Sequence, residues 1–492
     1  MKEATTLDER QHLAGLAEKA LAQGGEEQAE AHLASWLSRN APDVTLLHWT
    51  AMLRRALDRR DGAVAALGAA HRMAPDNAGV VHALAHVSLE AGLPSAALFE
   101  QAIRLAPAKG EIRLGLASAR LAEGEGDRAL GELEAMLGAN PGWMEGHRQF
   151  AQLAVMAGQE HRALTSIEAA LQRFPQSESL RNLAIDLLLS GERYAEALAV
   201  ADRAIATHGP VRPFVLARAA ALDELGRSAE AGAAFGELGP ATDSGHAVWR
   251  LRHWLRRGEV AQAVAEIEPW LARSGAEAFW PYAAIAWRLA GDARSDWLDG
   301  QDGLFRVIDL DLAEIGLDAL VPMLRRLHAR SGRFLDQSVR GGTQTDGALL
   351  GRCEPELVRV REVLRREVAQ FEAELPPVDP AHPMLGQKRV DRPRFAGSWS
   401  VRLAGAGFHA PHHHPQGWIS SALYLSVPDG LRPGEGWLDL GGAPEGLGDF
   451  APRASVEPKP ARLVLFPSWM WHGTRPFAAG ERMTIAFDIA RT

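Results

Sequence analysis

The sequence predicts a multidomain protein in which an all-α solenoid of helical hairpins is followed by a β-rich domain with flanking helices. Prolines recur through the first half at steps of 33, 32, 34, 34 and 35 residues, from Pro42 to Pro210. Alanine-rich segments with apolar residues at helical spacing lie between them. From about residue 395, short apolar runs alternate with Gly and Pro, which is typical of strands separated by turns.

Each repeat contains a proline landmark and a glycine landmark. The landmarks are Pro42, Pro75, Pro107, Pro141, Pro175 and Pro210, and Gly62, Gly92, Gly126, Gly158, Gly191 and Gly226. Proline is expected beyond the end of one helix, because it cannot continue the hydrogen-bond ladder. Glycine is expected in the tight turn between paired helices. A single hairpin cannot bury its apolar face, so we expect neighbouring hairpins to stack.

The repeats set the expected domain boundaries. Regular repeats run from about residue 30 to 240, and a less regular helical stretch continues to about residue 295. We therefore expect a helical solenoid over 1–295 and a β-rich domain over 296–492, with a generic helical bundle as the alternative for the first part. The period resembles that of the tetratricopeptide family. This resemblance implies a concave groove that holds a peptide or another protein.

Composition restricts the partners. The 492 residues carry a net charge of −9 without a basic stripe, which argues against nucleic acid. Cys353 is the one cysteine, so the chain has no disulfide framework and no cysteine-based zinc site. No stretch approaches the roughly 18–20 apolar residues needed to span a bilayer. We expect a cytoplasmic protein that does not enter membranes.

In the second half, strands are expected at 397–403, 418–427, 436–442, 461–468 and 482–490. Several short strands with turn signals between them predict a sandwich or barrel. A histidine cluster precedes the second strand. His412 and His414 share a face if the chain is extended there, and His413 then points to the other face. His472 follows the fourth strand.

These residues fit a particular chemistry. A non-haem Fe(II) oxygenase needs three protein ligands on one face of the metal, which leaves positions for a co-substrate and dioxygen. Arg482 lies ten residues after His472, and Thr484 shares its face of the strand. Arginine offers a planar donor fork that can hold a carboxylate.

Five segments carry a family resemblance. They are "RGGTQT" (340–345), "GSWSVRL" (397–403), "HHHPQGWISSALYL" (412–425), "LVLFPSWMWHGTRPF" (463–477) and "ERMTIAFDI" (481–489). Together they resemble the double-stranded β-helix (jelly-roll, cupin-like) oxygenases that depend on Fe(II) and 2-oxoglutarate. More narrowly, they resemble a bacterial family of such oxygenases that often follows tetratricopeptide repeats.

The resemblance implies Fe(II), 2-oxoglutarate and dioxygen as cofactor and co-substrates. His412 matches the first metal ligand of the family and His472 the distal one, while Arg482 with Thr484 matches the co-substrate clamp. The sequence departs from the family at His414, which stands where the family has Asp or Glu. We expect three histidine ligands. The alternative is that water or another carboxylate, from Asp439 or Asp429, takes the third position.

Further residues are candidates for the site. Tyr424 and Ser421 lie in the strand after the histidines and could hydrogen-bond the co-substrate. Arg340, Gln344 and Trp418 could line the site.

The expected function is hydroxylation of a peptide or protein that the repeats recruit. The alternatives are a catalytically silent metal-binding scaffold, a small-molecule hydroxylase, and a cupin-like enzyme that uses another metal without 2-oxoglutarate.

Overall fold

The computed structural model describes residues 2–329, 332, 338–345, 348–387, 389 and 392–491. The chain forms two compact units. One comprises residues 1–133 with 347–362, and the other comprises residues 134–346 with 363–492. In the described part of the chain, no helix is both long enough and apolar enough to cross a membrane.

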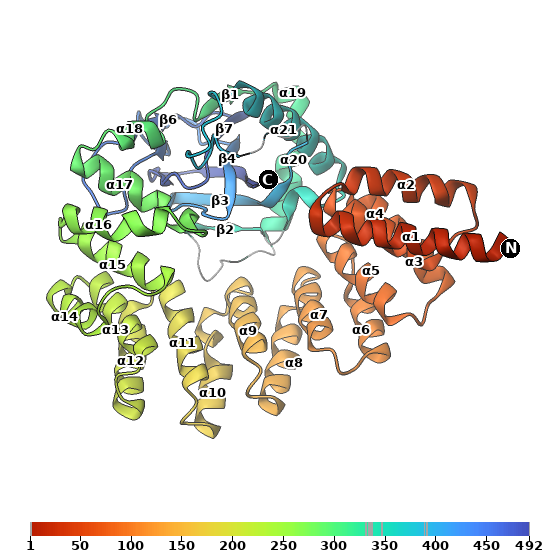
Figure 1. Ribbon diagram of the computed structural model, residues 1–492, viewed down its shortest axis with the longest axis horizontal. Coiled ribbons are helices and arrows are strands. Elements are labelled where there is room, and N and C mark those ends of the chain that lie inside the picture. Colours follow the sequence, from red (N-terminus) through yellow and green to blue (C-terminus); the bar gives the residue numbers. More distant parts are fainter. Residues whose placement is uncertain are drawn as a thin grey trace. The chain divides into compact units, whose positions relative to one another are not determined.

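Paired helices occupy the chain from residue 2 to residue 299 (Figure 1). They are α1 (Lys2–Gln23), α2 (Glu26–Arg39), α3 (Val44–Ala56), α4 (Arg60–Met73), α5 (Ala78–Glu90), α6 (Ala96–Leu105), α7 (Gly110–Ala122), α8 (Gly126–Ala139), α9 (Met144–Met156), η1 (Glu160–Arg162), α10 (Thr165–Arg173), α11 (Glu178–Ser190), α12 (Tyr194–His208), α13 (Arg212–Glu224), α14 (Ser228–Leu238), α15 (Ser244–Arg256), α16 (Val260–Leu271), η2 (Ala276–Ala278), α17 (Trp280–Ala290) and α18 (Arg294–Asp299). The predicted solenoid of helical hairpins is confirmed.

The landmark prolines lie where the sequence places them, two or three residues before the first helix of a pair. The expectation for the glycines is wrong in part, because Gly62 lies inside α4 and Gly126 is the first residue of α8. The left-handed residue that turns the chain is instead the second residue after the first helix ends. It is Asp58, Gly92, Gly124, Gly158, Glu192, Gly226 or Gly258 in successive pairs. Glycine fits there because its positive φ is unstrained.

Residues 347–362 pack within the first unit. They include η3 (Leu349–Gly351) and the start of α21 (Pro355–Glu374). The backbone N–H of Cys353 donates to the carbonyl of Ala91 at 3.1 Å, which ties this segment to the end of α5.

The second unit contains two antiparallel sheets, the double-stranded β-helix that the sequence predicts. The strands are β1 (Arg306–Asp309), β2 (Val339–Gln344), β3 (Phe395–His409), β4 (Gly417–Ser426), β5 (Leu438–Leu440), β6 (Ala454–Val456), β7 (Arg462–Pro467), β8 (His472–Thr474) and β9 (Glu481–Ala490). The larger sheet has the order β1-β7-β4-β9-β3-β2 and the smaller one β6-β5-β8. Two helices, α19 (Leu312–Ile315) and α20 (Leu317–His328), lie between β1 and β2 in the chain.

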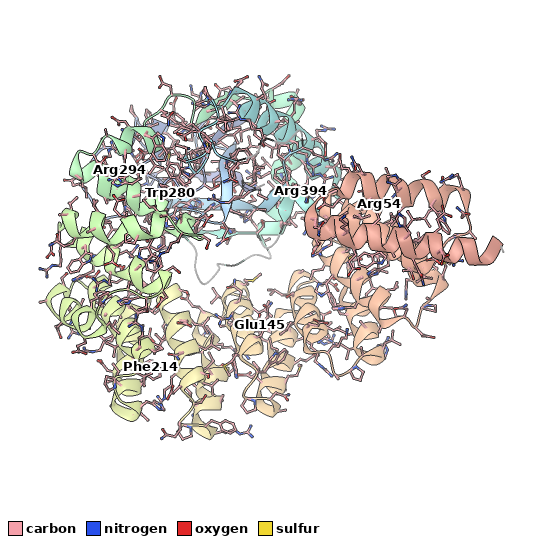
Figure 2. All side chains as sticks on the ribbon, viewed as in Figure 1. Arg54, Glu145, Phe214, Trp280, Arg294 and Arg394 are labelled. Carbon is pink, nitrogen blue, oxygen red and sulfur yellow. The ribbon has the colours of Figure 1, made fainter. Side chains whose placement is uncertain are left out.

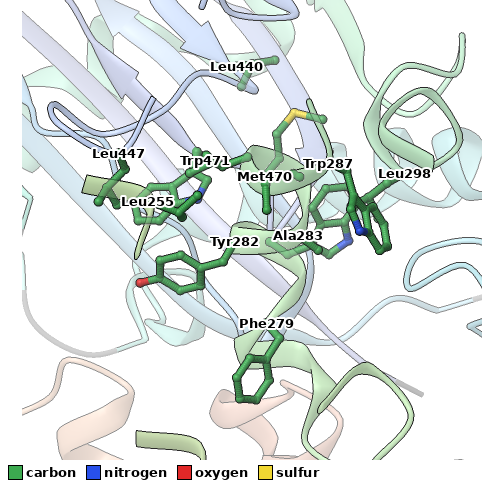
Figure 3. Packing of buried hydrophobic residues seen from close by; sticks show 14 of the residues in the cluster. Leu255, Phe279, Tyr282, Ala283, Trp287, Leu298, Leu440, Leu447, Met470 and Trp471 are labelled. Atoms are coloured by element: carbon green, nitrogen blue, oxygen red, sulfur yellow. The ribbon is translucent and has the colours of Figure 1, made fainter. Parts of the chain in front are cut away.

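Helices α15 to α18 and the strands share one hydrophobic core (Figure 3). Trp471, the residue before β8, is buried in it and donates its indole N–H to the carbonyl of Pro281 at 3.0 Å. Trp280 and Arg294 mark α17 and α18 in Figure 2. Arg453, from the loop before β6, donates to Asp299 at 3.0 Å. The core therefore crosses residue 295, where the sequence places a domain boundary, and that boundary stays a prediction.

Candidate active site

Backbone hydrogen bonds hold the histidine segment against β8 and the end of β7. His412 and His472 exchange two N–H···O bonds of 2.9 Å, and the N–H of His414 donates to Ser468 O at 2.7 Å. The ring centroids of His412 and His472 are 4.1 Å apart, and each lies 5.1 Å from that of His414. One ring nitrogen of each histidine lies within 4.8 Å of the others, so the three side chains form a group that could hold a metal ion.

Hydrogen bonds also determine which ring nitrogen each histidine presents. The Nδ1 atoms of His412 and His472 lie 2.9 Å from the carbonyls of Ala410 and Met470. A carbonyl can only accept, so each Nδ1 carries the proton and each Nε2 keeps its lone pair. His414 follows the same rule with a different acceptor, because its Nδ1 lies 2.8 Å from Asp488 Oδ1. The three Nε2 atoms are therefore the nitrogens left for a metal.

Burial keeps the imidazoles of His412 and His472 neutral. It is the main cause that lowers the pKa of His412 and of His472 well below the ordinary histidine value, and the neighbouring histidines lower it further. The neutral ring is the form that binds a metal. For His412 and His472, the lowered pKa and the hydrogen bond of Nδ1 therefore indicate the same state, a neutral ring with a free Nε2.

A pocket lies beside these rings on the inner face of the larger sheet. Strand alternation and register place its walls: Val401 and Tyr424 are both paired with Thr484, on β3, β4 and β9 respectively. Trp399 and Phe466 close it, with ring centroids 5.4 Å from His414 and 4.7 Å from His472. These apolar walls reduce the exposure of the histidines to water, and His472 is buried while His412 and His414 are partly exposed.

Arg482 is the buried cation of this pocket, and its side chain is 2% exposed. It donates to Gly436 O at 2.7 Å and to Thr474 Oγ1 at 2.9 Å, while its Nε has no hydrogen-bond partner among the described residues. No carboxylate in the described part of the chain pairs with it. Burial lowers the pKa of Arg482 from its ordinary value, but arginine stays charged in proteins.

The hydroxyl of Tyr424 is a second unsatisfied polar group in this pocket. Its hydroxyl is buried and has no hydrogen-bond partner among the described residues. Its ring lies 5.8 Å from the guanidinium carbon of Arg482. Leaving buried polar groups unsatisfied is unfavourable by about 1–3 kcal/mol each. A guanidinium whose Nε is unsatisfied and a phenol without a hydrogen-bond partner, both in one pocket, fit a carboxylate that accepts from both.

The other predicted residues differ in their suitability. Thr484 is on the pocket wall with Arg482. Ser421 also contributes to the wall, but its hydroxyl donates to Phe487 O at 3.0 Å and accepts from Phe487 N–H at 2.9 Å. That hydroxyl is engaged with the backbone of β9, so Ser421 is less suited to a co-substrate than Tyr424 or Thr484.

Three residues that the sequence suggested as site lining lie outside the pocket wall. Arg340 instead forms an ion pair of 2.6 Å with Glu192. Gln344, at the end of β2, is likewise absent from the pocket wall. The pairing of β4 with β9 shifts register at Trp418, and its indole donates to Met384 O at 3.0 Å. The structure places these three side chains away from the wall of this pocket, and their part in the site stays a prediction.

The carboxylates considered as a third ligand are also placed elsewhere. Asp439 accepts two hydrogen bonds of 2.8 Å from Arg475 and one from Ser455. Asp429 is exposed in the loop after β4. Neither belongs to the group of potential metal ligands found in the described residues.

Sequence reasoning missed two features of the site. His409 lines the pocket, and burial together with Arg482 lowers the pKa of His409 to about 3. Asp488 accepts a hydrogen bond from Nδ1 of His414, the ring nitrogen that is not available to a metal. Alternation along β9 could have found Asp488, because it is six residues after Arg482 and therefore on the same face.

The structure combines a jelly-roll domain with three histidines that could hold a metal beside a buried cation, which is close to the facial set of two histidines and one carboxylate of non-haem iron oxygenases but has a histidine in place of the carboxylate. Residues 397–488 match the model of the family described as "Putative 2OG-Fe(II) oxygenase". The chain therefore carries a 2-oxoglutarate/Fe(II) oxygenase domain, preceded by helical repeats. The match covers less than a fifth of the 492 residues, so it describes this domain and not the whole chain.

Solved structures give weaker similarities. A prolyl-4-hydroxylase from Pseudomonas putida is 19% identical over 38% of this chain and 93% of its own, with a TM-score of 0.27. A tetratricopeptide repeat protein from Parabacteroides merdae is 18% identical over 46% of this chain and 91% of its own, with a TM-score of 0.30. The protein MamA is 15% identical over 32% of this chain and 95% of its own, with a TM-score of 0.28. Similarities of this size carry no inference. No curated protein matches the sequence.

Proposed function

We propose that the chain is an Fe(II)- and 2-oxoglutarate-dependent dioxygenase that hydroxylates a peptide or protein. The observation that carries the proposal is the pairing of two features in one pocket: three histidines whose Nε2 atoms take no part in the hydrogen bonds of Nδ1, and the buried guanidinium of Arg482, which has no carboxylate partner among the described residues. When bound, Fe(II) and 2-oxoglutarate supply the activation of dioxygen for hydroxylation.

In this proposal His412, His414 and His472 hold the iron. Arg482, with the hydroxyls of Tyr424 and Thr484, holds the distal carboxylate of 2-oxoglutarate. A guanidinium and a phenol suit this role because both donate hydrogen bonds to an anion, and bonds between charged groups are the stronger kind.

The walls of the pocket have their own role. Trp399 and Phe466 pack against the rings of His414 and His472 and limit the access of water to them. Excluding water strengthens the attraction between the guanidinium and a carboxylate, because the local dielectric is low. The recruitment of a peptide by the helical repeats rests on the general use of such solenoids as binding surfaces.

Titration of 2-oxoglutarate into the Co(II)-loaded protein tests the role of Arg482. We expect Arg482→Ala to weaken 2-oxoglutarate binding by about 100-fold, the effect of losing a charge-assisted pair of about 3 kcal/mol, while Co(II) binding persists. Arg482→Lys keeps the charge but not the fork, and should lie between the two. Arg475→Ala is the matched control, because Arg475 pairs with Asp439 and should leave 2-oxoglutarate binding unchanged.

The outcomes separate the functions. Formation of succinate from 2-oxoglutarate by the wild-type protein with Fe(II) supports the dioxygenase. Unchanged 2-oxoglutarate binding in Arg482→Ala would remove the clamp from the proposal. Tight metal binding with no binding of 2-oxoglutarate would instead favour a silent metal-binding module. Mass spectrometry of cellular proteins with and without the active chain, for one added oxygen atom, addresses the substrate.

A further inference from the structure

His414 differs from the other two histidines in what holds its Nδ1. His412 and His472 each donate to a backbone carbonyl two residues before them in the chain. His414 donates to a carboxylate, Asp488 Oδ1, at 2.8 Å, across 74 residues of sequence. His414, which stands where the family has Asp or Glu, is thus the histidine whose Nδ1 donates to a carboxylate.

Asp488 is built into this position. It lies on β9 directly opposite Ser420 on β4, and Ser420 Oγ donates to Asp488 Oδ1 at 2.5 Å. Ser420 Oγ also lies 3.0 Å from Ser468 Oγ, and Ser468 O accepts the backbone N–H of His414. Gly417 leaves the space for this network, because a Cβ there would lie 2.5 Å from Ser468 Oγ.

Asp488 has no cationic side chain to neutralise it. Its side chain is 14% exposed, and in the described part of the chain its ion-pairing partner is the ring of His414, with no Lys or Arg. The other acidic side chains of this region differ: Asp439 pairs with Arg475, and Glu481 with Arg325 and Arg402. A largely buried carboxylate without a Lys or Arg partner is costly to desolvate unless another positive charge lies nearby.

In the proposed complex, the positive charge that Asp488 needs comes from the metal and Arg482, as the sum of the charges shows. Fe(II) and the guanidinium of Arg482 bring three positive charges into the pocket, and 2-oxoglutarate brings two negative ones. Three imidazoles that bind the metal as neutral ligands contribute none, so one positive charge stays uncompensated in this partly buried site. Asp488 supplies the missing negative charge, one hydrogen bond behind the ligand.

We infer that Asp488 is a positioning residue for the metal: through the Nδ1–H of His414 it fixes the ring and supplies the negative charge that a carboxylate ligand would carry. This inference rests on the proposed metal site. A carboxylate behind a ligating histidine orients the ring and raises the basicity of its other nitrogen.

Anaerobic titration with Co(II), read by absorption and calorimetry without 2-oxoglutarate, tests this role. We expect Asp488→Asn to bind Co(II) about 10-fold more weakly and Asp488→Ala about 100-fold more weakly, the range found for such partners. Asparagine keeps an acceptor and loses the charge, whereas alanine loses both. Asp439→Asn is the matched control, a carboxylate of the same domain that should leave Co(II) affinity unchanged.

A double-mutant cycle separates positioning from folding. Asp488→Asn should add nothing further in a His414→Ala background, because its effect passes through that ring. His414→Asp combined with Asp488→Asn should bind Co(II) more tightly than Asp488→Asn alone, because the charge then enters the ligand set. Ser420→Ala, which frees Asp488 without removing it, should weaken Co(II) binding by a smaller factor and serves if Asp488 variants misfold.

The outcomes are distinct from failure of the proposed function. Wild-type Co(II) affinity in Asp488→Asn, or equal losses with and without His414, would overturn the role of Asp488 while the metal site stands. Unchanged Co(II) binding in both His414→Ala and His472→Ala would overturn the metal site itself, and this inference with it.

Discussion

The helical repeats and the β domain join residues over very different distances in the sequence. In a helical pair, the residue that turns the chain lies two positions after the first helix, as Gly226 does after α13. In the β domain, His412 bonds to His472 and His414 to Asp488, 60 and 74 residues apart. A repeat can therefore be altered without disturbing distant residues. The site depends on the register of several strands at once.

Helices α15 to α18 share a hydrophobic core with the strands, so they depend on distant residues as the β domain does. Trp471 precedes His472, and its ring lies 5.7 Å from that of Tyr282 on α17. The same indole donates to Pro281. Changes in α17 should therefore reach the histidines of the proposed metal site, whereas changes in the first repeats should not.

Truncating one aromatic side chain in each region tests this difference. Trp471→Ala should lower the free energy of unfolding by about 3–5 kcal/mol and weaken Co(II) binding, because the cavity borders His472. Phe99→Ala, at a fully buried position in the first unit, should bring a similar loss of stability without changing Co(II) affinity. Hydrogen exchange and Co(II) titration measure the two effects. Equal weakening of Co(II) binding by both variants would contradict the separation.

A pH series tests a buried histidine that supports the sheet away from the metal. His328, on α20, lies 2.9 Å from Thr343 Oγ1 and 3.0 Å from Ser400 Oγ, and burial, with Arg402 nearby, lowers the pKa of His328 to about 4. The unfolded chain binds the proton with a pKa near 6.5, so stability is complete above pH 6.5 and falls as the pH drops towards 4. The expected loss is about 3 kcal/mol.

Comparing the wild type with a variant that cannot titrate at residue 328 isolates the contribution of His328 to acid sensitivity. His328→Gln, which cannot titrate, should lose less stability than the wild type between pH 7.5 and 4.5 in urea unfolding. Parallel curves for the two proteins would show that His328 does not contribute to the acid sensitivity.

The fold could be predicted from the sequence because its signals are local or periodic. The proline period located the helical pairs, and the alternation of His412 and His414 placed their rings together. The phase of the glycines was misassigned, because Asp58 and Glu192 occupy the left-handed position in two pairs and hide the pattern. Spacing along the sequence therefore indicates the period of the repeats more reliably than it indicates which residue has the left-handed conformation.

The site was predicted less completely, for a physical reason. His472 and Arg482 came from a resemblance to a family, and no period in the chain indicates them. The contact of His414 with Asp488 depends on the pairing of β4 with β9, which brings Ser420 opposite Asp488. The ion pair of Arg340 on β2 with Glu192 in the turn after α11 joins segments that are far apart in the sequence, so it likewise cannot be read from composition.

The smallest predicted effect concerns the two kinds of turn in the repeats. Gly226 has φ 76° and no heavy atom within 4 Å of an added Cβ, so Gly226→Ala introduces backbone strain alone. We expect it to lower the free energy of unfolding by about 1 kcal/mol. Glu192 has φ 55° at the equivalent position, so Glu192→Gly should raise it by about 0.5–1 kcal/mol.

The ion pair of Glu192 with Arg340 is the competing term, and it is exposed on the Glu192 side, so its contribution is about 0–1 kcal/mol. Glu192→Gln keeps the strained backbone and removes the charge, and its change in stability therefore measures the ion pair alone. Subtracting it from the change in Glu192→Gly leaves the backbone strain. Urea unfolding of the three variants gives these values. A Glu192→Gly protein less stable than Glu192→Gln would show that the left-handed turn is unstrained for a side chain, and that glycine at the other turns has a role besides its conformational freedom.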